Sequence, residues 1–287
     1  MIFINKDSPL IMISEMSYTY PNGTEALKNI NINIYRGELI GIMGKNGAGK
    51  TTLIRTLNGL IRPTKGIIYF ENENIYEKTI ATISKKVGIV FQNPYHQLFA
   101  NSIEEEIKFS LKSFNLPKDE TQNRIDNILA EFNLEKYRKR SPLNISGGES
   151  KKLAIASIVC RNPEVLIFDE PTLGQDEKEM EFFINLINNE KNKGKTIIII
   201  THNTEFSYEH LPRTILMADG EIIADGPTQR IFENEALISS ASLVLPQIRQ
   251  LCIAMEKLGF HEVNKLNSRD ELINYLQDFL SSNLTKA

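Results

Sequence analysis

A glycine-rich stretch decides the fold of this chain: Gly44-Lys45-Asn46-Gly47-Ala48-Gly49-Lys50-Thr51-Thr52. It follows an apolar run at residues 39–43 and precedes a helix-like run at residues 53–57. This order of strand, loop and helix fits the pattern G-x-x-x-x-G-K-[ST], in which glycines let successive backbone N–H groups turn toward phosphate oxygens. The helix also directs the positive end of its dipole at that anion. The stretch therefore predicts a nucleotide site.

Two side chains at the end of the stretch supply further chemistry. Lys50 would place a positive charge beside the β- and γ-phosphates, and the hydroxyl of Thr51 suits Mg²⁺. The alternative is a chance glycine-rich turn, because the pattern alone specifies few residues. The flanking strand and helix favour the nucleotide site.

The bulk properties are those of an ordinary globular protein. The 287 residues are enough for a well-buried core and suggest about two domains. The net charge of −3 gives no electrostatic reason to expect nucleic acid as a partner. Cys160 and Cys252 belong to no C-x-x-C or Cys/His cluster, which argues against a disulfide framework and against a zinc site.

Targeting and membrane-spanning segments are not expected. In residues 1–7 the apolar start gives way at once to Asn5, Lys6 and Asp7, so no signal-peptide core forms. The longest aliphatic run, residues 197–200, is far shorter than the roughly 18 residues of a membrane span. Together with the isolated cysteines, these features predict a cytoplasmic, reducing environment.

The apolar pattern predicts strands and helices in separate parts of the chain. Strands are expected at residues 10–20, 30–34, 66–70, 87–91, 165–168 and 195–201, and a hairpin joins residues 214–218 to 221–224. Helical spacing is expected at residues 177–189, and throughout residues 93–162 as an insertion between strands of one sheet. After residue 235, amphipathic helices follow Pro246 and a capping box at residues 268–271. A small docking or dimerisation domain is the simplest interpretation of that end.

Polar residues lie at the ends of several predicted strands. Asp169 and Glu170 follow a continuous apolar run, where open α/β sheets bind ligands. We expect Asp169 to hold a metal, directly or through water, and Glu170 to accept the hydrogen bond of an attacking water; a pair of solvated turn acids is the alternative. His202 would end on the same sheet edge, although a lone histidine at a strand end is more often structural. Gln92 has the position of an ordinary solvated cap.

Two further features allow a plain and a functional interpretation. Ser146 and Glu149 have the spacing of a capping box, yet Gly147 and Gly148 in the first turn each cost about 1 kcal/mol of helix propensity relative to alanine. Glycines are useful there if another backbone or a phosphate must come close. Tyr20, just before a turn at residues 21–23, either packs on its neighbours or provides a ring on which adenine stacks.

These features occur in a single order along the chain: the phosphate loop, Gln92, Ser146-Gly147-Gly148-Glu149, Asp169-Glu170 and His202. In combination they resemble the nucleotide-binding subunit of ATP-binding cassette (ABC) transporters, over residues 10–230. Within that family the chain looks most like the ATPases of energy-coupling factor transporters, which import vitamins or cobalt and nickel ions. That narrower resemblance lies in the C-terminal helical segment and in two runs, Phe91-Gln92-Asn93-Pro94 and Gln97-Leu98-Phe99.

The resemblance implies a fold, a domain division and a location. The fold would be α/β, with a P-loop NTPase core of ABC-ATPase type, an antiparallel β subdomain and a helical subdomain at residues 93–162. Residues 1–235 would form the nucleotide-binding domain, and residues 236–287 a small C-terminal docking or dimerisation domain. The chain would lie at the cytoplasmic face of the cell membrane as a peripheral subunit.

The resemblance also implies roles for single residues around ATP and Mg²⁺. Tyr20 would stack on adenine, and residues 44–52 together with Gln92 would bind the nucleotide. The metal would lie among Thr51, Gln92 and Asp169. Glu170 would polarise the water, while Lys50 and His202 would contact the γ-phosphate.

A second ABC ATPase would complete the site in a head-to-tail pair. Ser146, Gly147, Gly148 and Glu149 would act on the partner's ATP, and Asp176 would lie at the junction between the two sites. The family's usual Ala-Gly-Leu-Asp is Leu173-Gly174-Gln175-Asp176 here, and its signature's first Leu and frequent last Gln are Ile145 and Glu149. The polar Gln175 at the expected seam leaves open whether the chain pairs with itself or with a related chain. We favour a different partner slightly, because these transporters often use two unlike ATPases.

A multi-span membrane subunit is the other implied partner. Residues 92–99 link the metal site to a loop, and Pro94, Tyr95, Leu98 and Phe99 are more apolar than a free loop needs. A substrate-binding membrane subunit would be reached only indirectly. ATP would favour the closed pair of ATPases and hydrolysis would release it.

Two other functions are weighed against transport. An ABC-type ATPase of DNA repair or translation is disfavoured, because the sequence has neither a long heptad coiled coil nor a basic stripe. A regulatory subunit that binds ATP without hydrolysing it is disfavoured by the presence of Glu170 and His202.

Overall fold

The computed structural model describes residues 8–260, 262–263, 266 and 269–284. The predictions that concern residues 1–7 and the capping serine Ser268 lie outside the described residues. Within the described residues, no helix is both long and apolar enough to cross a bilayer.

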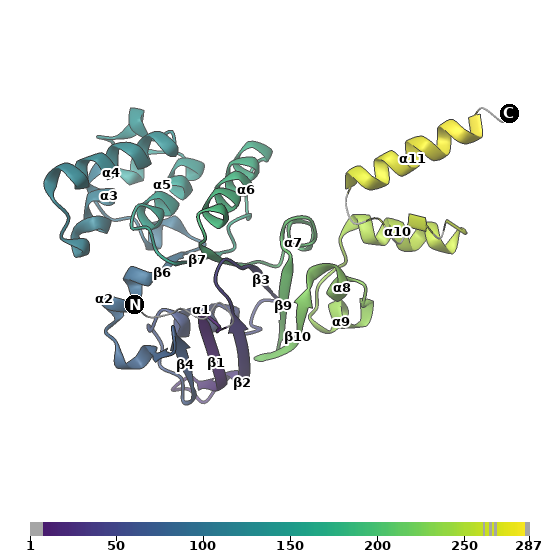
Figure 1. The fold of residues 1–287 in the computed structure, drawn as a ribbon, viewed down its shortest axis with the longest axis horizontal. Coiled ribbons are helices and arrows are strands. Elements are labelled where there is room, and N and C mark those ends of the chain that lie inside the picture. The colour runs from purple at the N-terminus through teal and green to yellow at the C-terminus, as the bar shows by residue number, and fades with distance from the viewer. Residues whose placement is uncertain (1–7, 261, 264–265, 267–268, 285–287) are drawn as a thin grey trace.

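The described strands form two sheets (Figure 1). The antiparallel sheet has the order β2-β1-β4-β5, from β1 (Ile11–Thr19), β2 (Glu25–Ile34), β4 (Lys65–Phe70) and β5 (Glu73–Asn74). The second sheet has the order β10-β9-β3-β8-β7-β6, from β3 (Leu39–Met43), β6 (Val87–Val90), β7 (Val165–Asp169), β8 (Thr196–Ile200), β9 (Arg213–Ala218) and β10 (Glu221–Pro227). Its pairs are parallel except for the hairpin of β9 and β10. The predicted strands and hairpin are confirmed.

The predicted helical insertion is also confirmed. Its helices are α3 (Ile103–Leu111), α4 (Lys118–Glu131) and α5 (Gly147–Val159), and they gather at one side of the molecule (Figure 1). The remaining long helices are α1 (Lys50–Leu57), α6 (Glu177–Asn192), α10 (Gln247–Lys257) and α11 (Arg269–Leu284). Four shorter helices were not predicted: α2 (Ile80–Lys86), α7 (Thr204–His210), α8 (Thr228–Phe232) and α9 (Glu235–Ser240). Each has seven residues or fewer, which is too short for a helical period to be recognised.

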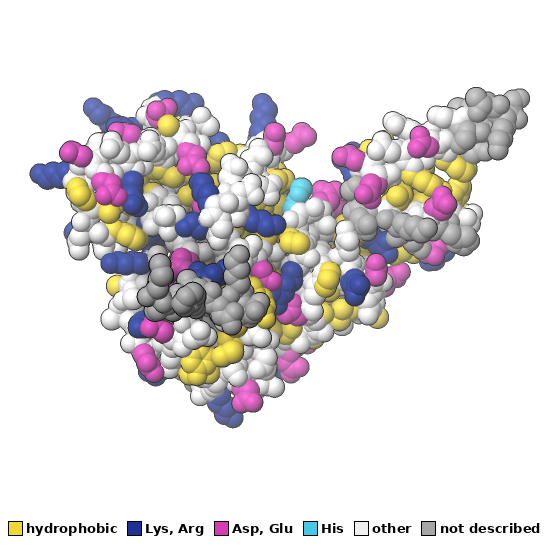
Figure 2. Space-filling view, viewed as in Figure 1, with side chains coloured by type: hydrophobic (Ala, Val, Ile, Leu, Met, Phe, Trp, Pro, Cys, Tyr) yellow, Lys and Arg dark blue, Asp and Glu magenta, His cyan; other side chains and the backbone are white. Residues whose placement is uncertain are grey.

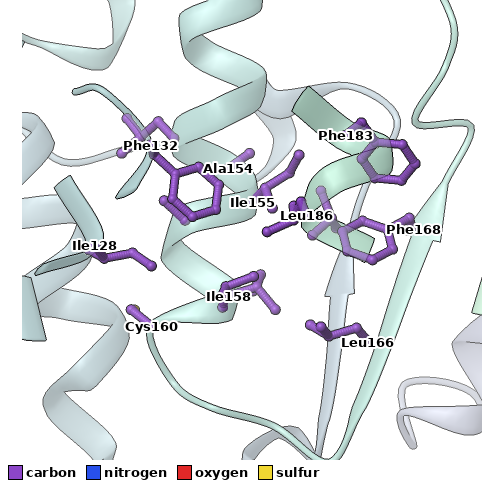
Figure 3. Packing of buried hydrophobic residues seen from close by; sticks show 14 of the residues in the cluster. Ile128, Phe132, Ala154, Ile155, Ile158, Cys160, Leu166, Phe168, Phe183 and Leu186 are labelled. Carbon is purple, nitrogen blue, oxygen red and sulfur yellow. The ribbon is translucent and has the colours of Figure 1, made fainter. Parts of the chain in front are cut away.

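Strand alternation separates the core into two layers on the faces of the parallel sheet. In β7, Leu166 and Phe168 join the cluster formed with the helical insertion and α6, whereas Val165 and Ile167 join the cluster under the antiparallel sheet. Figure 3 shows Phe168 facing Phe183 of α6, with Ile155 and Ile158 of α5 nearby. Because both faces are covered, these strands are continuously apolar, as predicted for a buried parallel sheet.

A third core cluster belongs to the C-terminal part of the chain. It joins Met43 at the end of β3 and Leu216 of β9 to residues of α7 to α11, among them Tyr208, Phe232, Ile248 and Cys252. In Figure 1, α10 and α11 project beside α8 and α9, away from the helical insertion. The C-terminal helices are therefore packed on the strand that leads into the glycine-rich loop.

Candidate nucleotide site

A cavity of about 530 Å³ brings together residues from separate parts of the chain. The predicted residues that line it are Tyr20, Asn46, Gly47, Gly49, Lys50, Thr51, Thr52, Gln92, Asp169 and Glu170. Gly44, Lys45 and Ala48 of the glycine-rich stretch do not line it. A larger cleft of about 750 Å³ contains none of the predicted residues, so we place the site at the smaller cavity.

The phosphate loop packs closely against strands β9 and β2. Gly44 has φ +149°, and a Cβ added there would lie 2.2 Å from the carbonyl oxygen of Met217 in β9. Gly49 has φ +102°, and its added Cβ would lie 2.6 Å from the carbonyl oxygen of Ala26 in β2. Neither position accepts a side chain, because both the backbone angle and the neighbouring carbonyl forbid it.

The ammonium group of Lys50 is held at the mouth of this loop. Its Nζ donates to the carbonyl oxygens of Gly44, at 2.6 Å, and of Lys45, at 3.0 Å. The side chain is buried, and burial lowers the pKa of Lys50 while the charges of Glu170 and Asp169 oppose that shift. The loop thus presents a fixed, poorly hydrated cation to a ligand in the cavity.

The two predicted carboxylates have different surroundings. Burial raises the pKa of Asp169 to about 6, and the charge of Glu170 adds to the rise, while Lys50 and Arg55 oppose it. Glu170 has φ +48°, and its backbone N–H donates to the carbonyl oxygen of Ile200 at 2.8 Å. The turn after β7 therefore fixes Glu170 against the neighbouring strand.

His202 lies at the same sheet edge as Glu170, as its position after β8 led us to expect, and it also contacts Glu170. Its Nδ1 lies 2.8 Å from Oε1 of Glu170, and its backbone N–H donates to Oε2 at 3.4 Å. The imidazole is half exposed and does not itself line the cavity. His202 and Glu170 therefore form one hydrogen-bonded pair at the edge of the site.

Tyr20 packs on a neighbouring ring and also lines the cavity. Its ring packs edge-on against Tyr18, with 4.9 Å between centroids, which is the plain packing role. Its hydroxyl lies 3.0 Å from Oγ1 of Thr52, and the residue lines the cavity. A ring is thus available beside the phosphate loop.

The chemistry of the cavity fits a hard cation. Thr51, Gln92 and Asp169 all line it, and hydroxyl, amide and carboxylate oxygens are the ligands that Mg²⁺ takes. The raised pKa of Asp169 indicates a carboxylate short of positive charge, which a bound cation would supply. The residues present therefore fit the predicted metal.

Residues 146–149 lie outside the cavity, at the start of α5. Ser146 and Glu149 form the predicted capping box: Oγ of Ser146 accepts from the N–H of Glu149 at 3.3 Å, and Glu149 accepts from the N–H of Ser146 at 2.8 Å. A hydrogen bond with Tyr137, followed by those with Ser146, lowers the pKa of Glu149. The carboxylate of Glu149 is thus folded back onto the helix end.

The two glycines of this turn face different surroundings. A Cβ on Gly148 would lie 1.7 Å from Oε1 of Glu179, whereas one on Gly147 would meet nothing within 4 Å. Glu179 belongs to the capping box that Asp176 forms at the start of α6. A side chain at Gly148 would therefore displace the Glu179 carboxylate, while Gly147 leaves open space at the helix end.

Residues 92–99 are only partly exposed. Pro94 and Leu98 are buried, whereas Tyr95 is 49% and Phe99 65% exposed. Phe99 packs edge-on against the exposed ring of Phe109, with 4.7 Å between centroids. The apolar surface of this loop therefore consists of aromatic rings, and it extends onto α3.

Five residues of the cavity were not predicted: Thr24, Glu25, Ala26, Asp219 and Gly220. They come from the start of β2 and from the turn between β9 and β10. Oδ1 of Asp219 lies 2.9 Å from Nζ of Lys45, so this turn contacts the phosphate loop. The sequence marks Asp219-Gly220 as a hairpin turn, but it does not indicate that this turn reaches the phosphate loop.

Comparison with known proteins gives consistent matches. A family model described as ABC transporter matches residues 27–173. The energy-coupling factor transporter ATP-binding protein EcfA of Methanothermobacter thermautotrophicus is 37% identical over 272 residues, covering 93% of this chain and 88% of that one. The chain spans only 44% and 45% of the length of two putative ABC transporter ATP-binding proteins, from Methanosarcina acetivorans and Methanosarcina mazei, which it matches at 37% and 36% identity.

Two solved structures are similar over most of the chain. CbiO1 from Clostridium perfringens, described as part of the ABC transporter complex cbiONQ, has a TM-score of 0.73 and 34% identity, over 88% of this chain and 98% of that one. A dimeric post-hydrolysis state of the ATP-binding cassette MJ0796 bound to ADP and Pi has a TM-score of 0.69 and 28% identity, over 76% of this chain and 98% of that one.

Proposed function

Since this chain belongs to the ABC transporter family and has the fold of its ATP-binding cassettes, we propose that it binds and hydrolyses ATP to drive an importer of the energy-coupling factor type. One observation carries the proposal: the phosphate loop, Gln92, Asp169 and Glu170 line a single cavity although they are far apart in sequence. The similarity to the EcfA protein and to CbiO1 supports the importer type. The cargo would be a vitamin or a transition-metal ion.

The residues of this chain would act by position and charge. Lys50 stabilises the negative charge that develops on the transferring phosphoryl group, and Glu170 orients the attacking water. The hydrogen bond between His202 and Glu170 holds the carboxylate in place, and the imidazole would contact the γ-phosphate. Mg²⁺ bound by Thr51, Gln92 and Asp169 would add positive charge to the phosphate oxygens.

A second ABC ATPase would supply the rest of the site. Residues 146–149 lie outside this chain's own cavity, with the positive end of α5 and the open space at Gly147 facing outward. We therefore place them over the ATP of a partner in a head-to-tail pair, with Asp176 at the junction. Closing the pair excludes water and completes the shell of charges. The dimeric form of the similar MJ0796 cassette supports this arrangement.

Residues 92–99 would contact a multi-span membrane subunit, so that the chain is peripheral to the membrane at its cytoplasmic face. The exposed rings of Tyr95, Phe99 and Phe109 offer an apolar surface next to Gln92. The face shown in Figure 2 does not suggest a surface that binds nucleic acid, because Lys and Arg side chains are mixed there with acidic ones and form no single basic band. A substrate-binding membrane subunit would be reached through the membrane partner.

The Glu170→Gln variant tests hydrolysis. Steady-state release of phosphate should fall at least about 100-fold, because the water loses its carboxylate partner, while ATP-dependent pairing persists. The matched control is Glu181→Gln, which neutralises an exposed carboxylate on α6 and should leave turnover unchanged. Equal ATPase rates in the wild type and Glu170→Gln would remove Glu170 from this role.

The importer assignment is tested by identifying the proteins that co-purify with the chain. From membranes we expect a multi-span protein rather than ribosomes or DNA. Phe99→Asp should weaken that association, because it puts a charge into the proposed contact, and Leu60→Asp is a control at another exposed apolar residue. Recovery with ribosomes or DNA would reject the assignment even if the chain hydrolyses ATP.

A further inference from the structure

Helix α7 connects His202 to the C-terminal helices. The helix begins two residues after His202, and Asn203 is its N-cap, accepting from the N–H of Phe206 at 3.0 Å. The N–H of Asn203 in turn donates to Oγ1 of Thr201 at 3.0 Å. Because the cap holds the first turn to the end of β8, any displacement of α7 moves the backbone that carries His202.

The carboxylate of Glu205 in α7 caps helix α10. The N-cap of α10 is Pro246, which has no N–H and no side-chain acceptor for the exposed amides of the first turn. Oε1 of Glu205 accepts from the N–H of Gln247 at 2.7 Å. A carboxylate at a helix N-terminus is also favoured by the helix dipole. Glu205 therefore ties the start of α10 to the helix that follows His202.

Two buried polar side chains face each other across the same two helices. Tyr208 of α7 and Arg249 of α10 are 5% and 7% exposed; burial raises the pKa of Tyr208, and the nearby charge of Arg249 opposes that rise. Around them lie Phe232, Ile248 and Cys252 of the third core cluster. Since a buried guanidinium tolerates little displacement, this contact makes α7 and α10 one packed unit.

The C-terminal part also touches the phosphate loop directly. The N–H of Lys45 donates to the carbonyl oxygen of Ala241, just after α9, at 3.2 Å. Met43, which precedes the loop, is fully buried in the third core cluster. The C-terminal helices therefore support the two segments that would face the γ-phosphate from opposite sides, the loop and His202.

The geometry points to Glu205 as a positioning residue for ATP hydrolysis: by capping α10 it fixes α7, and through α7 it sets His202 against Glu170. This inference rests on the proposed hydrolysis of ATP, and it gives the C-terminal helices a role in catalysis beyond docking. It follows that a change at the base of α10 alters turnover in a chain that still pairs.

Three variants of the full chain separate this role from plain stability. Glu205→Ala removes the cap and should lower kcat about three- to ten-fold with affinity for ADP unchanged, because ADP lacks the γ-phosphate that His202 is proposed to contact. Glu205→Gln keeps an oxygen acceptor and should restore most of kcat. Glu209→Ala removes a carboxylate from the same helix without touching α10 and should equal the wild type. A Glu205→Ala variant that loses only melting temperature would overturn the inference.

A double-mutant cycle shows whether Glu205 acts through His202. If it does, Glu205→Ala should have no further effect on kcat in a His202→Ala background. Independent, multiplying losses would mean that Glu205 acts elsewhere, and would overturn the inference. The ligand-free chain gives a second readout: the imidazole NMR signals of His202 should shift in Glu205→Ala and stay in place in Glu209→Ala.

Two controls distinguish a positioning role of Glu205 from an effect on pairing and from failure of the proposed ATPase function. Pairing is measured in a Glu170→Gln background, where Glu205→Ala should still dimerise with ATP; loss of pairing there would assign the effect to docking and reject the positioning role. A wild-type chain without ATPase activity would reject the proposed function together with this inference. An active wild type with an unchanged Glu205→Ala variant would reject this inference alone.

Discussion

Asp169 and Glu170 are adjacent in sequence, but their neighbours differ. The carboxylate of Glu170 is paired with Nδ1 of His202, whereas Asp169 is buried beside the cation of Lys50. In the proposed roles, Glu170 must point steadily at the attacking water, and its hydrogen bond with His202 would hold it there. Asp169 must bind a cation, and its buried carboxylate would be stabilised by one.

The raised pKa of Asp169 predicts how stability depends on pH in the ligand-free chain. Its ordinary value is 3.8 and its folded value about 6, so between these values the folded state holds the extra proton. Stability therefore falls as pH rises through this window, because the buried carboxylate must ionise. Asp169→Asn should lack that loss. In chemical unfolding from pH 4 to 7, the free energy of unfolding of the variant should rise relative to that of the wild type up to about pH 6, and the difference should then stay constant.

The control for this experiment is Asp119→Asn, at an exposed aspartate of α4, which should run parallel to the wild type throughout. Parallel curves for Asp169→Asn as well would show that the folded and unfolded pKa values of Asp169 are equal. When Mg²⁺ and ATP are added, binding should weaken below about pH 6, since the protonated carboxyl no longer binds the cation.

Tyr20 can be tested by separating its ring from its hydroxyl. Tyr20→Phe loses the contact with Thr52 but keeps the ring, so ATP affinity should change less than about three-fold. Tyr20→Ala loses the stacking surface, and affinity should fall about 10-fold or more, since base–aromatic stacking contributes about 1–3 kcal/mol. Titration calorimetry with ATP measures both. Equal affinity in Tyr20→Ala would leave Tyr20 with the packing role alone.

At the scale of elements, the start of α5 contains a capping box that stabilises the helix and a glycine that faces open space. The capping box of Ser146 and Glu149 satisfies the amides of the helix end. Gly148 lies against Glu179 of α6, so the first turns of the two helices contact each other. Gly147 has no such neighbour, which agrees with the proposal that a partner's phosphate approaches there.

Alanine substitutions at the two glycines should have different effects. Gly148→Ala displaces the Glu179 carboxylate from the capping box of α6, and the loss of about 1 kcal/mol should cancel the gain in helix propensity. Gly147→Ala should stabilise the isolated chain by up to about 1 kcal/mol, because alanine is the better helix former. It should nevertheless reduce ATPase activity, since the methyl stands where the partner's phosphate approaches. Full activity in a stabilised Gly147→Ala would contradict the head-to-tail pair.

At the scale of the whole molecule, the third core cluster joins the parallel sheet to the C-terminal helices. Met43 and Leu216 lie in strands of the parallel sheet, and Ile248 and Cys252 lie in α10. The division at residues 235 and 236 remains a prediction about domains, and α9 begins at that boundary. With a shared core, the C-terminal helices and the parallel sheet should unfold together.

A pair of isoleucine substitutions tests that cooperativity. Ile248→Ala, at 8% exposure, should shift a single urea transition of the whole chain by about 2–4 kcal/mol. Ile273→Ala in α11, at 40% exposure, should shift it by less than about 1 kcal/mol. Far-ultraviolet dichroism and tyrosine fluorescence should give the same midpoint. Two separate transitions, with only one affected by Ile248→Ala, would show an independent C-terminal domain.

The sequence by itself determined the features with a local pattern. The glycine-rich loop, the buried strands and the capping box of α5 each depend on neighbouring residues, and the structure confirms them. The resemblance to energy-coupling factor ATPases depends on the order of short motifs, and the comparisons confirm it. The short helix α7 was missed, because its seven residues are too few for a helical period to be recognised.

Only the tertiary structure decided which distant residues meet. The contacts of His202 with Glu170, of Lys45 with Asp219, of Gly148 with Glu179 and of Glu205 with Gln247 each join segments from different elements. No periodicity or spacing encodes such pairs, because they depend on how strands order in the sheet and on how helices pack across it. The chemistry of the site was therefore readable from local sequence, while its support by the C-terminal helices arises only from packing.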